Sequence, residues 1–309
     1  MRRTLIKRLA TSNRVERLVN SSPVTDELLI NYVAGEHRSD ALEVVDDLIW
    51  KGLSTSVTFL AQPAETVSEA AEVTNEYLWL LDALTPRQLG DHAELSIKLS
   101  TIGRGINGNG DELALNNAAA LCRAARNAGI EITIEAEEAA TVRSALAIVN
   151  ELRSDFPGLG IAIQAMLYRS EDDCITMAEG GGRVRLCKGQ YRESSTIAHT
   201  DRHAIDLAFV RCLRILMEGD GYPMIATHDP RLVRIAQRLA SNSGRSPDTW
   251  EMQMIHGVRP LEQRRISDIG QHMRVYVPYG NDWYPYYMQA LAERPDNIKL
   301  FLRSLLGRR

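Results

Sequence analysis

The sequence predicts a TIM-like (β/α)8 barrel preceded by an N-terminal helical extension. Two observations lead to this fold class. Eight short apolar runs alternate with longer helical stretches, which is typical of βα units around a parallel sheet. These units occupy about 250 of the 309 residues, and that is the usual size of such a barrel. A third observation is that polar side chains occur at the ends of the runs, and this predicts that the barrel is an enzyme.

The first part of the chain has helical periodicity and no strand pattern. Apolar residues recur at spacings of three and four, as in Leu42, Val45 and Ile49, and this spacing places them on one face of a helix. We therefore expect residues 1–52 to form the extension and residues 53–309 to form one catalytic barrel.

The eight apolar runs read as strands. They cover residues 56–60, 95–99, 130–135, 160–165, 183–188, 222–226, 250–255 and 273–277. A helical stretch follows each of them, and the last begins near Asp282. An open doubly wound sheet is the alternative, but it should carry a Gly-x-Gly-x-x-Gly turn after its first strand, and none follows residues 56–60.

A glycine-rich segment, GRGINGNG at 103–110, follows the second run instead. It has no Lys-Ser/Thr pair of the phosphate-binding type. We expect a flexible active-site loop there, with a structural turn as the alternative.

Composition excludes several classes of function. A net charge of -4 disfavours nucleic-acid binding, which needs a clustered basic face. His199 and His203 have a spacing that could bind a metal, but they fall on a helix rather than at strand ends, so we predict a solvated face and no metal site.

The expected location is the cytoplasm. The four cysteines form no Cys-x-x-Cys pair, and free thiols suit a reducing compartment. No run approaches the roughly 20 apolar residues that span a bilayer. Basic residues near the N-terminus, Arg2, Arg3, Lys7 and Arg8, allow weak peripheral contact with the inner face of the membrane.

Polar side chains gather at the carboxyl ends of the predicted strands. They are Lys98, Glu135, Gln164, Arg185, Lys188, His228, Gln253 and Tyr276. Burying such groups inside a barrel is costly unless they face a site, and barrel enzymes place their chemistry at these ends.

Several segments resemble the proline dehydrogenase family. They are LSIKLS, IQA, RLCKGQYRE, MIATHDPRL, EMQMIHGVR, RVYVPYG and YPYYMQALAERPDN, in order, from about residue 40 to the C-terminus. The resemblance implies a distorted (β/α)8 barrel that binds FAD and removes hydride from the carbon beside the ring nitrogen of proline.

The resemblance also implies a set of cofactor contacts. They are Gln164, Arg185, Lys188, Gly189, Thr227, His228 and Glu293, with Arg185 beside flavin N5 and Gln164 beside the pyrimidine edge. A cation near the ring would favour reduced flavin, which carries negative charge. Two alternatives stay open: Arg185 and Lys188 could be a solvated pair, and His228 could be a core histidine bonded to backbone.

On the substrate side the resemblance implies Lys98 and Tyr276, which with Arg185 form the expected catalytic set. The remaining substrate contacts would be Gln62, Glu135, Gln190, Tyr191, Tyr286 and Gln289. The match fails at several of these positions. The family's Arg-Arg pair, which holds the substrate carboxylate, reads Gln289-Ala290, and the acid that pairs with the lysine reads Gln62. The strand-three aspartate is Glu135, and Gln190 and Arg192 flank Tyr191 where a small residue and an aromatic are usual.

These departures lie on the substrate side of the motifs rather than the flavin side. The expected function is an FAD-dependent dehydrogenase of a C–N or N–N bond in a small amine or imino acid, in a specialised biosynthetic pathway. An ordinary catabolic proline dehydrogenase that forms 1-pyrroline-5-carboxylate is one alternative, and a flavin-binding barrel without turnover is another. We expect a quinone as electron acceptor, with oxygen as the second candidate.

Overall fold

The computed structural model describes residues 32–283, and in them eight parallel strands close into a barrel in sequence order. The strands are β1 (Ser54–Phe59), β2 (Ala93–Ile97), β3 (Glu131–Ile134), β4 (Gly160–Gln164), β5 (Arg183–Cys187), β6 (Tyr222–Ala226), β7 (Glu251–Ile255) and β8 (Met273–Tyr279). Pairing of β1 with β8 completes the ring. The predicted fold class and all eight predicted strands are confirmed.

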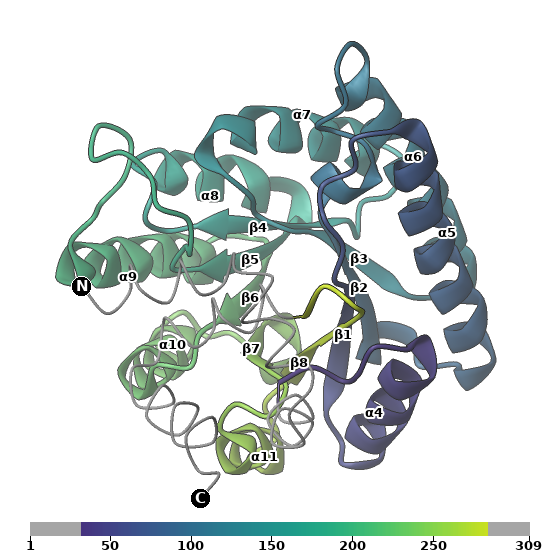
Figure 1. Cartoon of the computed structure of the whole chain (residues 1–309). Helices are drawn as coiled ribbons and strands as arrows, with labels where there is room; N and C mark the ends of the chain where they lie inside the picture. Colours follow the sequence, from purple (N-terminus) through teal and green to yellow (C-terminus); the bar gives the residue numbers. More distant parts are fainter. Residues whose placement is uncertain (1–31, 284–309) are drawn as a thin grey trace, which may run out of the picture.

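Helices surround the strands (Figure 1). They are α4 (Arg38–Trp50), α5 (Val67–Leu84), α6 (Gly110–Ala128), α7 (Val142–Arg153), α8 (Ser170–Ala178), α9 (Arg202–Glu218), α10 (Pro230–Asn242) and α11 (Pro260–Asp268). Short 3-10 helices join some of them: η1 (Thr85–Arg87), η2 (Gly90–His92), η3 (Leu99–Ile102), η4 (Ala139–Thr141), η5 (Glu179–Gly181) and η6 (Pro247–Thr249).

Helix α4 belongs to the wall of the barrel. It packs against β1 and β8, and the segment before it is bonded to the end of β8, where Ala34 N donates to Pro278 O at 2.8 Å. Within residues 32–283, α4 therefore covers the seam that a helix after the eighth strand would cover in a simple barrel. The boundary between extension and barrel at residue 52 stays a prediction.

The strands alternate between two kinds of residue. On β2, Leu95 and Ile97 are buried among apolar residues of the core, whereas Glu94 and Ser96 bond to residues of other strands across the barrel interior. Because helices cover the outer face, apolar residues point outward to them and polar residues point inward. The main hydrophobic core is thus the layer between strands and helices.

The glycine-rich segment 103–110 forms a turn, which was the alternative expectation; its two ends are buried, whereas residues 105 and 107–109 are exposed. A Cβ at Gly110 would lie 2.5 Å from the backbone oxygen of Arg104, so the chain passes itself too closely for a side chain. Arg104 is itself buried and ion-paired to Glu137 at 2.5 Å, which ties the turn to the end of β3.

Candidate active site

The carboxyl end of the barrel brings together three of the predicted substrate residues. Lys98 follows β2 directly, and Glu135 follows β3 beside it, because Glu135 N donates to Ile97 O at 2.8 Å. The hydroxyl of Tyr276 on β8 donates to Glu135 Oε1 at 2.5 Å. Lys98 is half-buried, and within residues 32–283 no ion pair or hydrogen bond reaches its Nζ. A cation without a partner beside a fixed phenol and carboxylate is suited to binding an anionic group.

Arg185 lies deeper, in the interior of the barrel. Its Nη1 donates to Ser96 Oγ at 2.7 Å and its Nη2 to Ser56 Oγ at 3.1 Å, and Nη2 also pairs with Glu94. The guanidinium carbon lies 5.9 Å from the centre of the Tyr276 ring. The side chain is only 6% exposed, so the alternative of a solvated Arg185 is wrong.

Gln164 is the last residue of β4, and only one of its two side-chain polar atoms is hydrogen-bonded within the described residues. Its Nε2 donates to Glu137 O at 2.7 Å, whereas its Oε1 is buried and has no hydrogen-bond partner among the described residues. A buried acceptor without a donor costs free energy unless a ligand supplies one.

Lys188 and Gly189 follow β5. Lys188 Nζ lies 2.5 Å from Asp206 Oδ1 on α9 and 3.4 Å from Asp229 Oδ2, the residue that caps α10. Gly189 has φ of 100°, and a Cβ there would lie 2.7 Å from Met166 Cγ. The two acids hold the lysine at the strand end, and only glycine fits the position after it.

Thr227 and His228 follow β6. The buried Thr227 accepts a hydrogen bond at Oγ1 from Asp229 N at 3.2 Å. His228 Nε2 accepts one from Ile255 N at 2.9 Å, and the backbone oxygen of His228 accepts from Arg259 Nη1 at 2.9 Å. One ring nitrogen of His228 is therefore bonded to backbone, which is the contact that the core-histidine alternative expected, although the residue is only half-buried.

The remaining predicted contacts lie in loops or outside the described residues. Gln62 and Gln190 are exposed in the loops after β1 and β5. Tyr191 packs against the small apolar cluster that contains Met166, and burial, with Glu137 and Glu135 nearby, raises the pKa of its phenol to about 12. Tyr286, Gln289 and Glu293 fall outside residues 32–283.

Four buried charged residues lie in the barrel interior, beneath the carboxyl ends of the strands (the barrel mouth). The sequence alone did not identify them as part of the site. They are Glu94, Arg183, Glu251 and Arg274, and no side chain among them is more than 10% exposed. Burial alone would raise the pKa of Glu94, but Arg185, Arg274 and Arg183 outweigh burial and hold that pKa below its usual value. The signal was present: every second residue of β2 and β5 is polar, and helices cover the outer face of a barrel strand, so those side chains had to face inward.

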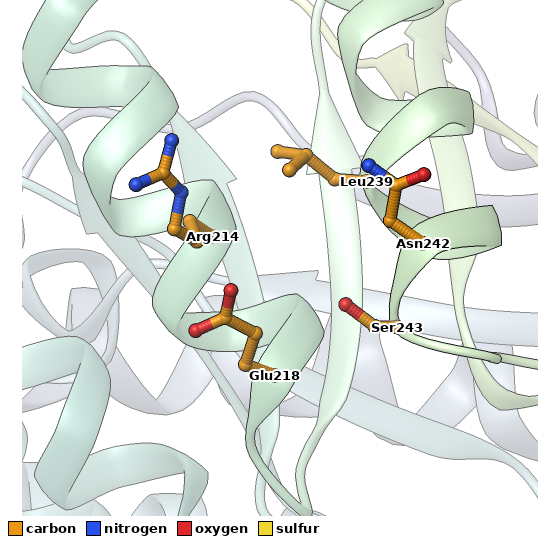
Figure 2. Close-up of a pocket in the computed structure, with 5 residues that line it drawn as sticks. All are labelled: Arg214, Glu218, Leu239, Asn242 and Ser243. Atoms are coloured by element: carbon orange, nitrogen blue, oxygen red, sulfur yellow. The ribbon is translucent and has the colours of Figure 1, made fainter.

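One cavity among the described residues lies away from this site. It has a volume of about 440 Å³ and is lined by Arg214, Glu218, Leu239, Asn242 and Ser243, between the ends of α9 and α10 (Figure 2). Those helix ends lie at the amino-terminal side of the barrel, opposite the carboxyl ends of the strands, and the lining shows no catalytic grouping. A smaller cavity, of about 20 Å³, lies near the ends of β3 and β4, and Glu135 and Gln164 are among the residues that line it.

The described residues contain neither a candidate metal-binding cluster nor a membrane-spanning helix. No group of three or more His, Cys, Asp or Glu side chains within 32–283 is placed to hold a metal ion. None of the helices in that range combines the length and hydropathy needed to cross a membrane.

Comparison with known proteins identifies relatives over nearly the whole chain. The family model described as proline dehydrogenase matches residues 41–293. Proline dehydrogenase 1 of Bacillus subtilis subsp. natto is 33% identical over 275 residues, which is 89% of each chain. Proline dehydrogenase of Deinococcus radiodurans is 30% identical over 277 residues, again 89% of each.

A solved structure shares the fold. It is proline utilization A of Bdellovibrio bacteriovorus inactivated by N-propargylglycine, with a TM-score of 0.80 and 21% identity over 87% of this chain. The match spans about a third of that larger protein, 33% of its chain. The family match covers well over half of the present chain and agrees with the barrel fold. The chain therefore belongs to the proline dehydrogenase family of oxidoreductases.

Proposed function

We propose that the protein is an FAD-dependent dehydrogenase that oxidises a C–N bond, or an N–N bond, of a small amine or imino acid. The observation that carries this proposal is the group at the barrel mouth. Unpaired Lys98, the bonded pair Tyr276–Glu135 and buried Arg185 lie on or directly after four different strands and converge on one space. Such convergence is typical of barrel active sites.

The residues present fit a flavin. Gln164 Oε1 is a buried acceptor and Arg185 Nε is a buried donor, and neither has a partner within residues 32–283. The pyrimidine edge of a flavin offers an N–H to the first, and N5 of an oxidised flavin accepts a hydrogen bond from the second. Lys188, Gly189, Thr227 and His228 would complete the contacts, with Glu293 added by the family resemblance. Bound FAD would supply the hydride acceptor.

On the substrate side, Lys98 would bind a carboxylate or another anionic group, and Tyr276, fixed by Glu135, would form a wall against the substrate ring. Both would orient the carbon beside nitrogen toward the cofactor. Gln62, Gln190 and Tyr191 lie in loops around this space. Arg192 is a second candidate for the carboxylate contact.

We place the substrate outside simple L-proline, in a specialised biosynthetic reaction. Gln289-Ala290 stands where the family motif has Arg-Arg, and losing a bidentate charged contact costs about 3 kcal/mol, roughly a hundredfold in affinity. The ordinary activity, L-proline to 1-pyrroline-5-carboxylate, is the second candidate because relatives that cover 89% of the chain carry the proline dehydrogenase name. Electrons would then pass to a quinone, through peripheral contact of a cytoplasmic protein with the membrane, or to oxygen.

Anaerobic reduction of the bound flavin tests these alternatives. The wild type and a Gln289→Arg/Ala290→Arg variant are mixed with L-proline, pyrrolidine and substituted hydrazines. We expect the variant to gain roughly a hundredfold toward L-proline, while the wild type prefers a substrate without that carboxylate contact. Efficient reduction of the wild type by L-proline, with no gain in the variant, would establish the ordinary activity. If the protein binds FAD but no compound reduces it, the alternative of a flavin-binding barrel without turnover is supported.

A further inference from the structure

Glu94 is fully buried in the barrel and belongs to no expected contact with substrate or cofactor. Its Oε1 accepts from Ser56 Oγ at 2.6 Å and pairs with Arg185. Its Oε2 accepts from Thr133 Oγ1 at 2.8 Å and from Arg183 Nη2 at 2.9 Å. Such a carboxylate, saturated with donors, is held in one position and stays ionised.

Arg185 is thereby fixed before any ligand arrives. Ser96, Ser56 and Glu94 occupy both of its terminal nitrogens. Its Nε is buried and unbonded within the described part of the chain. The guanidinium thus keeps its Nε–H for an acceptor that a ligand would supply, while its Nη2 is paired with a negative charge.

We infer that Glu94 is a positioning residue that sets both the orientation and the effective charge of Arg185 toward bound flavin. This inference rests on the proposed function. A carboxylate paired with a guanidinium offsets part of its positive potential, and in a buried site that potential acts over several ångströms. Reduced flavin carries negative charge, so Glu94 would keep the reduction potential of the cofactor lower than Arg185 alone would set it.

The test is the isosteric variant Glu94→Gln, reconstituted with FAD. The reduction potential is measured by equilibration with a reference dye, and sulfite affinity by bleaching of the flavin spectrum. We expect a more positive potential and a dissociation constant for sulfite lower by at least about tenfold. Activity is not needed for either readout.

Glu251→Gln is the matched control. Glu251 is also fully buried and charged, but its Oε1 accepts from Arg274 Nε at 2.8 Å and from Gln253 Nε2 at 2.5 Å, and no hydrogen bond joins it to Arg185 in residues 32–283. We expect a clearly smaller shift in this variant. Equal shifts in the two variants, or no shift in Glu94→Gln, would overturn the role of the direct pair.

Two further outcomes are distinguishable. If Glu94→Gln does not fold, Glu94→Gln/Arg183→Met keeps the net charge of the buried group, and we expect a smaller shift in the same direction; an unchanged potential overturns the inference. If the wild type itself binds no FAD, or its flavin accepts no electrons from any amine or hydrazine, the proposed function has failed. Failure confined to the variants counts against Glu94 alone.

Discussion

Lys98 stands half-buried at the end of β2 with no partner among the described residues. An ammonium group kept in such a place loses hydration without gaining an ion pair. The family resemblance assigns Gln62, an amide with an exposed side chain, to the position of the acid that pairs with this lysine, and we propose that the charge of Lys98 is available for a substrate.

We expect Lys98→Met to lower kcat/KM by roughly a hundredfold, because the variant keeps the packing of the stem but loses a charged contact. FAD content should be unchanged. Steady-state kinetics and the flavin-to-protein absorbance ratio check both statements. The control is Lys51→Met, at the exposed C-terminal end of α4, and we expect its kcat/KM to equal that of the wild type. Loss of FAD together with activity would mean that Lys98 supports the cofactor instead.

The conformation of Gly189 leads to a second prediction. At φ of 100° a Cβ would meet Met166 Cγ and Sδ at 2.7 Å, so Gly189→Ala combines backbone strain with a clash. We expect a loss of about 1–3 kcal/mol in unfolding free energy and weaker FAD binding, measured by chemical denaturation and fluorescence titration.

The control for this variant is Gly129→Ala. Gly129 has φ of 67° at the end of α6, and nothing lies within 4 Å of its Cβ position. The Gly129→Ala variant should lose about 1 kcal/mol of unfolding free energy, and its affinity for FAD should equal that of the wild type. A Met166→Ala/Gly189→Ala double variant should recover the part of the loss due to the clash. Equal FAD affinity in wild type and Gly189→Ala would contradict a cofactor role for this loop.

At the scale of elements, α10 begins at a capped and charged N-terminus. Asp229 accepts a hydrogen bond from Arg231 N at 2.9 Å, with Pro230 as the first helical residue. Hydrogen bonds from Arg231, with Lys188 nearby, hold the pKa of Asp229 well below its usual value.

This lowered pKa predicts how stability changes with pH. A carboxyl whose pKa is lower in the folded state stabilises the protein above its unfolded pKa of about 4, and this contribution is lost as the pH falls through the folded pKa. Asp229→Asn keeps the cap but not the charge. The wild type should exceed it by about 1 kcal/mol above pH 5, allowing for solvent screening, and the difference should shrink below pH 4. Denaturation at several pH values measures this, with Asp201→Asn, the cap of α9, as the control. A difference that grows toward low pH would contradict the assignment.

The eight strands could be predicted because each combines a short apolar run with a following helical period. The position of α4 could not, since amphipathic spacing in Leu42, Val45 and Ile49 shows that a helix has a buried face but not which strands it covers. At the candidate site, Lys98 and Tyr276 were predicted from their polarity in or beside strands together with the family resemblance. The hydrogen bond from Tyr276 to Glu135 and the two acids around Lys188 depend on chain packing across more than one βα unit, which local pattern does not encode.

At the scale of the whole molecule, the barrel interior is ionic rather than apolar. Arg274 is fully buried and donates to Glu251 through Nε at 2.8 Å and Nη2 at 3.0 Å, and its Nη1 donates to Thr55 O at 3.0 Å. Glu94 and Arg183 extend the group toward Arg185. Every charge in it depends on a partner, because an unpaired buried charge is costly.

We therefore expect Arg274→Met to lower the unfolding free energy by about 3–5 kcal/mol, since Glu251 would remain buried without its cation. Arg274→Met/Glu251→Gln should recover most of the loss. Breaking the exposed Lys51–Asp47 pair with Lys51→Met should cost no more than about 0.5 kcal/mol. Urea denaturation compares the three, and a double variant no more stable than Arg274→Met would show that packing, not charge, sets the cost.

The central claim is that this barrel mouth binds FAD and passes electrons to it from an amine-type substrate. The most direct test is the visible spectrum of protein purified and supplied with FAD, followed by anaerobic addition of L-proline and then of other cyclic amines and hydrazines. The predicted result is one tightly bound flavin that is reduced by at least one of these compounds, and that is reduced far more slowly after Lys98→Met. Protein that binds no flavin, or flavin that every compound leaves oxidised, would contradict the account.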